Sequence, residues 1–420
     1  MTAANILQVI GKVTRKSARV LGNELNLAKR VNRSFDQEFG QSSGQIGTSL
    51  SVRRPIRPTV NQGMVADVQG VVETVSVLPF TDPYNVTFAL NSQELTMAVD
   101  DYFDKTGKPS IVALANRVEQ VGHQLITQVF NAVGTPGTPL TSGPSGTSIN
   151  AVGEALALLY TNDMPVGADD TTLIVGPQFN NQLVNSNLTY FNPGPEISAM
   201  YKKGLQGDFK DSRVFMNQLV QPHTNGVYGG TPTVATTVPA NATYPANGVN
   251  QSTIATTGWT ATTTSLNVGD IFTIAGVYTV NPQTKQNTGI LQQFAVASQT
   301  VTDGSGNSTI TVTPAVITTG GFQNVSQAPQ AGAAITVLGA SGAVTQNALA
   351  FHRDAFMLAA KELKPLFVGI GKTVKDHMTN IPIRCMMGSD FLTSQDYMRF
   401  DIYVAWATLY SQLACRIATT

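Results

Sequence analysis

One long stretch with almost no charged residues constrains the fold more than any other feature of this sequence. Between residues 220 and 345 the only charged side chains are Asp270, Lys285 and Asp303. The stretch is rich in Thr, shows no helical stripe and alternates along SLNVGDIFTIAGVYTV, LQQFAVASQTV, STITVTPAVI and AAITVLG, with turn signals such as NPQTKQNTG and DGSGNS between them. We therefore predict an all-β module, a small barrel or sandwich, inserted at residues 223–345.

Helical and mixed patterns flank this module on both sides. The most regular helical stripe runs from about Ser110, a plausible N-cap, to residue 133, with Gly134 just beyond it. Such a helix of roughly 23 residues spans about 34 Å, enough to act as the spine of a domain. A shorter helix at about 148–160, a buried strand at 171–176 and a helix after Pro177 follow. Together these patterns predict an α+β fold.

Two further segments have an extended or mixed character. Residues 41–92 alternate and carry four prolines, which predicts a long hairpin or arm. Its Arg53, Arg54 and Arg57 suit a phosphate, but in a projecting arm they more often pair with carboxylates of a neighbouring subunit. After Gln346 a helical and mixed pattern resumes in ALAFHRDAFMLAAKEL, and long alternating strands, IPIRCMMG and YMRFDIYVAWATLYSQLACRI, close the chain.

The N-terminal residues 5–33 have the apolar spacing of one or two amphipathic helices. The polar face carries one acidic residue, Glu24, against seven basic ones. Two interpretations stay open for this face, a solvated surface or a surface that meets an acidic partner. The seven residues are Lys12, Arg15, Lys16, Arg19, Lys29, Arg30 and Arg33.

The sequence contains no complete catalytic or metal-binding motif. His123 lies four residues after Glu119, but no third ligand is near, so a structural pair on the polar face of the helix is expected. VGIGKT at 368–373 resembles the end of a P-loop, yet Leu366 stands where that motif needs Gly. Cys385 and Cys415 lack CxxC spacing. We predict no enzyme, no metal and no cofactor.

Composition favours association over a free monomer. Lys+Arg and Asp+Glu both number 26, and only 12% of residues are charged, compared with about 25% in ordinary soluble domains. Near-zero net charge promotes association. Basic residues interrupt the apolar N-terminus where a signal peptide needs an unbroken core, so an intracellular product is expected.

Two segments carry a resemblance to a known family: GDIFTIAGVYTVNPQTKQNTGILQQFAVASQTV at 269–301 and NALAFHRDAFMLAAKELKP at 347–365. Both resemble the major capsid (coat) proteins of P22-like tailed bacteriophages, and the order of elements is similar over nearly the whole length. The resemblance implies an HK97-like capsid fold with an inserted β-barrel. The implied limits are an N-terminal arm at 1–40, an extended loop at 41–92, a peripheral domain with the spine helix at 93–140 and 375–420, an axial domain at 141–222 and 346–374, and the barrel at 223–345.

The resemblance also implies a function. Pentamers and hexamers of the chain would form an icosahedral shell, first a procapsid with scaffolding and portal proteins and then an expanded head that encloses double-stranded DNA without sequence preference. The shell would be a virion component assembled in the host cytoplasm, held without covalent crosslinks and without a membrane. The extended-loop arginines would lie at a subunit interface, and the seven basic N-terminal residues would face scaffold or DNA inside. The alternative is a β-rich tail-associated or surface adhesin.

Overall fold

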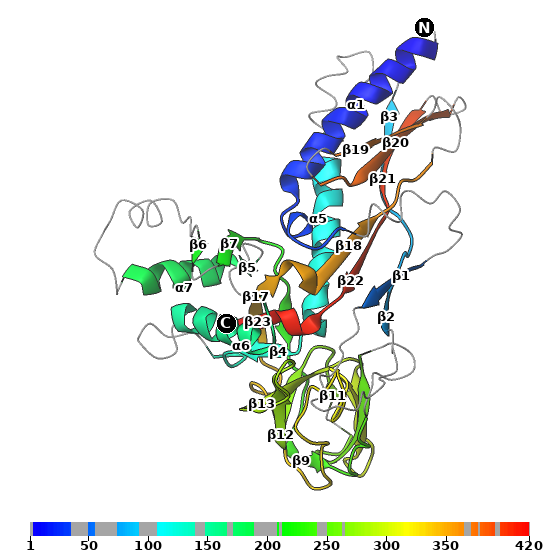
Figure 1. The fold of residues 1–420 in the computed structure, drawn as a ribbon. Coiled ribbons are helices and arrows are strands. Elements are labelled where there is room, and N and C mark those ends of the chain that lie inside the picture. The colour runs from blue at the N-terminus through cyan, green and yellow to red at the C-terminus, as the bar shows by residue number, and fades with distance from the viewer. Residues whose placement is uncertain are drawn as a thin grey trace, which may run out of the picture. The chain divides into compact units, whose positions relative to one another are not determined.

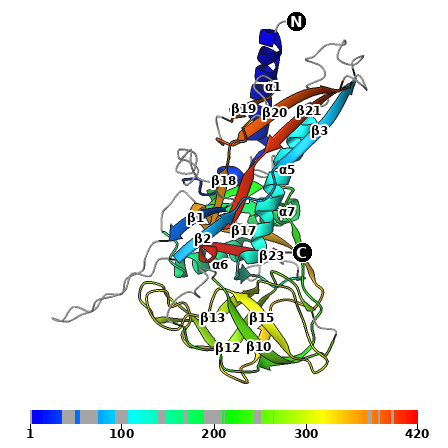
Figure 2. The same ribbon diagram turned by 90° about the vertical axis from the view of Figure 1, so that its right-hand side faces the viewer.

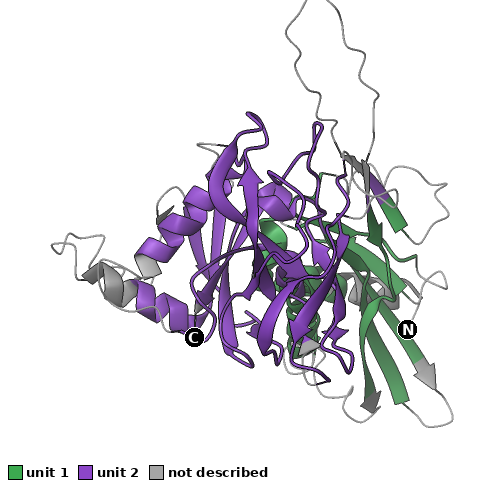
Figure 3. Ribbon diagram, turned by 90° about the horizontal axis from the view of Figure 1, so that it is seen from below, with its two compact units in different colours: residues 1–50, 77–123, 356–407 green, residues 51–76, 124–355, 408–420 purple. Residues whose placement is uncertain are grey.

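The computed structural model of the 420-residue chain describes thirteen ranges of residues, and the statements below concern these ranges. They are residues 3–34, 49–54, 74–91, 107–138, 148–165, 171–188, 208–209, 212–241, 250–262, 265–364, 371–376, 379–390 and 395–419. The chain divides into two compact units (Figure 3), each described by itself. Unit 1 comprises Met1–Leu50, Val77–His123 and Phe356–Ala407, and unit 2 comprises Ser51–Ser76, Gln124–Ala355 and Thr408–Thr420.

Unit 1 combines helices with a four-stranded antiparallel sheet (Figure 1). Its helical elements are α1 (Ala3–Glu24), the 3-10 turn η1 (Leu27–Lys29) and α5 (Lys108–Gln124). The strand order is β19-β20-β21-β3, with bounds Gly371–Lys375, Pro382–Asp390, Gln395–Ile402 and Tyr84–Asn91. Strands β18 (Phe356–Ala360) and β22 (Val404–Thr408) pair separately. Alternation along β20 and β21 points Ile383, Cys385, Phe400 and Ile402 into the core, as their period of two requires.

Unit 2 contains a mixed sheet of seven strands and two helices. The order is β4-β23-β17-β5-β7-β6, with β8 also paired to β17. The bounds are Asn131–Val133, Ala414–Thr419, Val344–His352, Thr171–Val175, Ser212–Met216, Asp208–Phe209 and, for β8, Pro222–Thr224. Helices α6 (Ser148–Thr161) and α7 (Pro177–Leu188) belong to the same unit. All five residues of β5, TTLIV, are buried, as expected for a strand with both faces covered.

The charge-poor stretch forms a second sheet within unit 2 (Figure 2), in the order β16-β12-β13-β15-β10-β9. The bounds in that order are Ile335–Val337, Ile271–Val280, Asn287–Val296, Ser308–Thr313, Ser252–Trp259 and Gly230–Val234. A bridge between Thr233 and Ala334 joins the two outer strands, and Val234 N donates to Ala333 O at 2.9 Å. The sheet thus closes on itself around buried residues that include Phe272, Phe294 and Ile310.

Two short pairs complete the described strands. They are β11 (Ser265–Leu266) with β14 (Thr300–Val301), and β1 (Ser49–Arg54) with β2 (Thr74–Pro79). The extended character expected for the arm is present in β1, β2 and β3, while residues 55–73 of that arm lie outside the described ranges.

The α+β class is confirmed, and so are the helices at 148–161 and 177–188 and the strand at 171–175. The spine helix was predicted too long, because α5 has 17 residues, roughly 26 Å. It tightens into the 3-10 turn η3 (Leu125–Gln128), and Val129 then adopts an extended conformation. Residues 131–133 instead pair with β23, so sheet pairing overrides the helical stripe there.

The helical pattern after Gln346 was also wrong. Residues 344–360 form β17, the 3-10 turn η4 (Arg353–Ala355) and β18. Leu349–His352 pair with β5 on one side, and Leu349–Phe351 with β23 on the other. A strand buried in this way has a continuous apolar run, which periodicity cannot distinguish from a buried helix.

The strand pairings also differ from the expected domain limits. The last expected strand, 397–417, is divided into β21, β22, the turn η5 (Ser411–Leu413) and β23. β23 pairs with β17 in unit 2, although it was grouped with the peripheral residues 375–420, and β18 falls in unit 1, although it was grouped with 346–374. The pattern of one strand carries no information about which sheet it joins.

Candidate interaction surfaces and the junction of the inserted sheet

Helix α1 has one buried and one charged face, and the buried face packs on β19 and β20. Val13, Ser17, Ala18 and Leu21 are buried at helical spacing. Gly22 lies so close to the Asp376 carboxylate that a Cβ would not fit, 2.6 Å from Oδ1. The close approach of α1 to the end of β19 therefore depends on this glycine.

Glu119 of α5 holds the chain that follows α1. Its carboxylate accepts the backbone N–H groups of Asn26, Leu27 and Ala28 at 2.9, 2.9 and 3.0 Å. These N–H groups lie at the start of the turn η1, where backbone donors need an acceptor from outside the turn and negative charge is favoured. His123 lies 3.9 Å from Glu119, and burial lowers the pKa of His123 to about 4, so it is neutral at neutral pH.

The Glu119–His123 pair was expected on a polar face, and that expectation was wrong. The two residues are only 1% and 3% exposed. The carboxylate tolerates burial because backbone N–H groups from a distant segment surround it. The sequence around Glu119 does not indicate that the backbone of residues 26–28 supplies these partners.

The seven basic N-terminal residues do not share one environment. Arg15, Lys16, Arg19 and Lys29 are exposed. Arg30 is half-buried and donates from Nη1 to the backbone oxygen and Oδ1 of Asn26, both at 2.9 Å. Arg33 is half-buried, and Lys12 lies in α1 but its side chain is outside the described set. The described basic residues exposed on α1 are therefore Arg15, Lys16 and Arg19.

The arm arginines and the P-loop-like segment give less information. Arg53 and Arg54 end strand β1, with side chains that are not described, and Arg57 lies outside the described ranges. Gly371–Lys375, which holds most of GIGKT, is strand β19 paired antiparallel with β20. A P-loop needs a helix at this point, so the motif is excluded by its own backbone.

The closed sheet meets the mixed sheet within unit 2, and we call this contact the junction. The chain enters and leaves through β8 and the start of β17, which pair Thr224 with Val344 and His223 with Thr345. Phe130, Ala132, Ile271 and Ala295 form a small apolar cluster there, with Leu338 against it. This cluster buries side chains from both sheets against each other.

Gln293 of β13 adds a polar clamp to that cluster. Ala132 N donates to Gln293 Oε1 at 2.7 Å, and Gln293 Nε2 donates to Ala132 O at 2.8 Å. Ala132 lies in β4, the outer strand of the mixed sheet, whose other side pairs with β23. The Gln293 amide thus acts as the missing neighbour strand for one residue.

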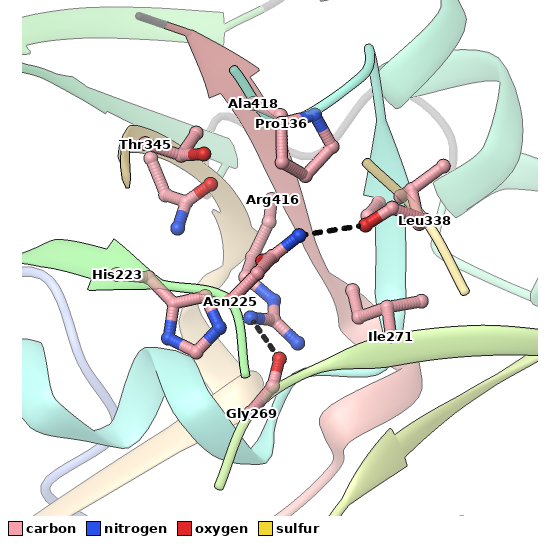
Figure 4. A pocket seen from close by; sticks show the side chains of 11 residues that line it. Pro136, His223, Asn225, Gly269, Ile271, Leu338, Thr345, Arg416 and Ala418 are labelled. Atoms are coloured by element: carbon pink, nitrogen blue, oxygen red, sulfur yellow. Dashed lines mark hydrogen bonds between the residues drawn. The ribbon is translucent and has the colours of Figure 1, made fainter. Parts of the chain in front are cut away.

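Charged groups meet beside the clamp, and Figure 4 shows two of the residues involved, His223 and Arg416. Asp270 is buried, its Oδ2 accepts N–H from Gly226 and Asn267 at 2.9 Å, and its Oδ1 lies 2.8 Å from His223 Nε2. Arg416 of β23 is 3% exposed and donates from Nη1 to Gly269 O at 2.8 Å. Burial lowers the pKa of Arg416 to about 10, against the opposing charge of Asp270, so Arg416 stays positive at neutral pH.

This group of residues was not predicted from the sequence. The available signal was the isolation of its members: Asp270 is one of three charged residues in the stretch 220–345, and Arg416 lies in an apolar C-terminal run. An isolated charge in such surroundings is rarely buried unless it is paired.

The described residues show no arrangement suited to metal chemistry. They contain no cluster of three His, Cys, Asp or Glu side chains that could hold a metal ion. Of the described helices, none is long and apolar enough to cross a membrane. Burial raises the pKa of Cys385 and of Cys415 to about 12, so both thiols stay protonated.

Comparison with solved structures finds phage capsids over most of the chain. The capsid of Ralstonia phage GP4 is 7% identical with a TM-score of 0.49, covering 94% of this chain and 88% of that one. A chain of Mycobacterium phage Che8 is 11% identical with a TM-score of 0.45, covering 94% and 90%. The CUS-3 coat protein I-domain is 28% identical over 26% of this chain and 96% of its own, with a TM-score of 0.20. No curated protein matches.

The sequence itself matches one protein family almost from end to end. The sequence model of the family described as "P22 coat protein - gene protein 5" matches residues 2–414. That family consists of structural capsid proteins, which does not favour the adhesin alternative. The chain therefore belongs to the P22 coat protein family and is a major capsid protein that forms the shell of a tailed bacteriophage.

Proposed function

We propose that this coat protein adopts the HK97-like arrangement with an inserted β-barrel and assembles around scaffolding protein and a portal into a procapsid. The procapsid then expands to enclose double-stranded DNA, and assembly takes place in the host cytoplasm. The observation that carries this proposal is the family match over residues 2–414. The closed sheet within 230–337, with its own buried cluster, supports the inserted barrel.

Electron microscopy of the purified full-length protein tests the assembly step. The protein alone and the protein with a candidate scaffold are imaged at equal concentrations. Closed shells of uniform curvature that depend on scaffold are expected. Fibres or dispersed monomers under both conditions would contradict the proposal.

The extended loop is proposed to reach a neighbouring subunit through Arg53, Arg54 and Arg57. Arginine forks pair well with carboxylates across interfaces. Replacing all three with Glu is expected to leave the circular dichroism of the monomer unchanged and to abolish shell assembly. The Lys variant of the three keeps the charge and should retain partial assembly. Unimpaired assembly of the Glu variant would remove this loop from the interface.

The exposed basic face of α1 is proposed to face the interior of the shell and to meet scaffold or DNA phosphates. Alanine at Arg15, Lys16 and Arg19, with or without Lys12, should lower retention of one of these partners. The loss should shrink as salt rises, because each ionic contact contributes to the salt dependence of binding.

A matched control removes three exposed positive charges elsewhere, at Lys108, Arg117 and Arg353. This control variant should retain scaffold and DNA as the original chain does. Loss of scaffold alone assigns the α1 face to assembly, and loss of DNA alone assigns it to packaging. Equal retention by both variants at every salt concentration would leave the face merely solvated.

A further inference from the structure

Arg416 has more donors than partners at the junction of the two sheets. Of its five N–H groups, the described structure gives one acceptor, Gly269 O, to Nη1. Nε and Nη2 are fully buried and have no hydrogen-bond partner among the described residues, and the same holds for Oγ1 of Thr345. Unsatisfied buried donors on a charged group are costly, so an acceptor is required at this edge of the guanidinium.

A second arginine of the same chain shows which acceptor the Nε and Nη2 edge of a guanidinium can bind. Arg384 donates from Nε and from Nη2 to a single oxygen, Oδ2 of Asp401, at 3.0 and 2.7 Å. One acceptor atom therefore satisfies both donors. For Arg384 a carboxylate supplies it, whereas no carboxylate among the described residues is hydrogen-bonded to Arg416.

The open edge of Arg416 belongs to a small cavity at the junction (Figure 4). Arg416, Thr345 and Asn347 line it together with apolar groups such as Ile271 and Leu338. Thr345 and Asn347 alternate on one face of β17, and Arg416, paired with Leu349, lies on that same face. The cavity has room for about one water-sized sphere.

We propose that this cavity binds one ordered water molecule. Its oxygen accepts from Nε–H and Nη2–H of Arg416, and its two hydrogens are donated to Thr345 Oγ1 and the Asn347 side-chain oxygen. These four contacts lie within the range of two to four hydrogen bonds that a buried water makes. A water fits better than a halide because Asp270 already opposes the charge of Arg416, and because a halide is larger.

The bound water has a structural consequence for the junction. Arg416 lies on β23 and Thr345 on β17, while Nη1 of Arg416 reaches Gly269 just before β12. The water thus connects Arg416 on β23 to Thr345 and Asn347 on β17. Arg416 is in turn hydrogen-bonded to Gly269, next to the closed sheet. The joint between the sheets is hydrated at its centre rather than dry.

A conservative variant tests whether the Thr345 hydroxyl is hydrogen-bonded to the water or has no partner. Thr345→Val keeps the shape and removes Oγ1. If the water is bound, this change raises the unfolding equilibrium constant of the full-length monomer about tenfold, as expected for one lost hydrogen bond to a charge-linked network. If Oγ1 is unpaired, the valine variant is as stable as the original or more stable, which overturns the proposal.

A double-mutant cycle tests the bridge itself. Thr345→Val and Arg416→Lys should together cost clearly less than the sum of the single changes, because either one disrupts the same water. The control cycle combines Thr345→Val with Arg384→Lys. Arg384 binds a carboxylate directly and lies in the other unit. That control should be additive. Additivity in the Arg416 cycle would overturn the bridge, and if Arg416→Lys does not fold, the Thr345→Val result decides alone.

Two further measurements identify the bound species. A map of the shell at a resolution that shows solvent should contain one peak within hydrogen-bonding distance of Arg416 Nε, Nη2 and Thr345 Oγ1, and an empty position overturns the proposal. Thermal unfolding is compared in sodium chloride and sodium methanesulfonate at equal ionic strength. Equal midpoints are expected for water, whereas a midpoint that rises with chloride concentration overturns it in favour of a halide.

Discussion

The Gln293 clamp makes a prediction that separates its hydrogen bonds from its packing. Gln293→Ala removes both bonds to Ala132, at 2.7 and 2.8 Å, and leaves a buried N–H and C=O without these partners. At about 1 kcal/mol net for each bond, with an added desolvation term, the loss is about 2–3 kcal/mol. Hydrogen exchange at the Ala132 amide, measured in the native state, should accelerate about 30- to 150-fold.

Gln293→Glu adds a pH dependence whose sign follows from the same geometry. An ionised carboxylate can accept from Ala132 N but places its second oxygen against Ala132 O, so the folded state raises the pKa of this Glu above its ordinary value of about 4.3. The stabilising contribution of the protonated side chain is fully present below pH about 4.3 and is lost as pH rises through the raised folded pKa. The variant should therefore approach the original chain in acid and fall below Gln293→Ala at neutral pH.

Denaturant unfolding of the full-length monomer across pH measures these differences, each referenced to the original chain at the same pH. Gln327→Glu serves as the control, because Gln327 is exposed and makes one bond, to Gly276 O at 2.9 Å. It should show no comparable pH dependence. A flat profile for Gln293→Glu, or a loss under 0.5 kcal/mol for Gln293→Ala, would refute the clamp as an energetic link.

Three further predictions follow from described contacts. Glu119→Gln replaces an acceptor of three backbone N–H groups by an amide and should cost about 2–3 kcal/mol in denaturant unfolding; an unchanged midpoint would contradict it. Gly306→Ala should cost about 1–3 kcal/mol, because φ is +77° and a Cβ would meet a backbone carbonyl, whereas Gly304→Ala, with open space around it, should be nearly neutral. Cys385 and Cys415, whose pKa values burial raises to about 12, should resist alkylation in the native monomer at mildly alkaline pH and react in denaturant; native reactivity at the denatured rate would contradict their burial.

Local periodicity predicted the elements whose conformation is set by their own apolar spacing. The helix at 148–161 and the buried strand at 171–175 follow directly from apolar spacing. The predictions failed where pairing with a distant strand decides the conformation. Residues 131–133 carry a helical stripe but pair with β23, and 347–360 read as helical but lie in β17 and β18.

The junction could not be predicted for a related reason. Asp270 and Gln293 belong to one hairpin, but Arg416 and Ala132, which they face, come from parts of the chain more than a hundred residues away, and no spacing rule brings these together. The resemblance to coat proteins identified the family but not these contacts. Sequence alone offered only the isolation of two charges, which predicts that each is paired but not with what.

Closure of the six-stranded sheet has a consequence for a protein that exists in crowded, concentrated arrays. Strands β9 and β16 would be the edges of an open sheet, and the bridge between Thr233 and Ala334 turns their backbone groups toward each other. A sheet of this length with almost no charge would otherwise be a template for strand addition between molecules. Charged gatekeepers are the usual protection against such growth, and here ring closure takes their place. Closure thus removes the edge on which a strand of a neighbouring copy could pair, which protects a dense shell lattice from growth by strand addition.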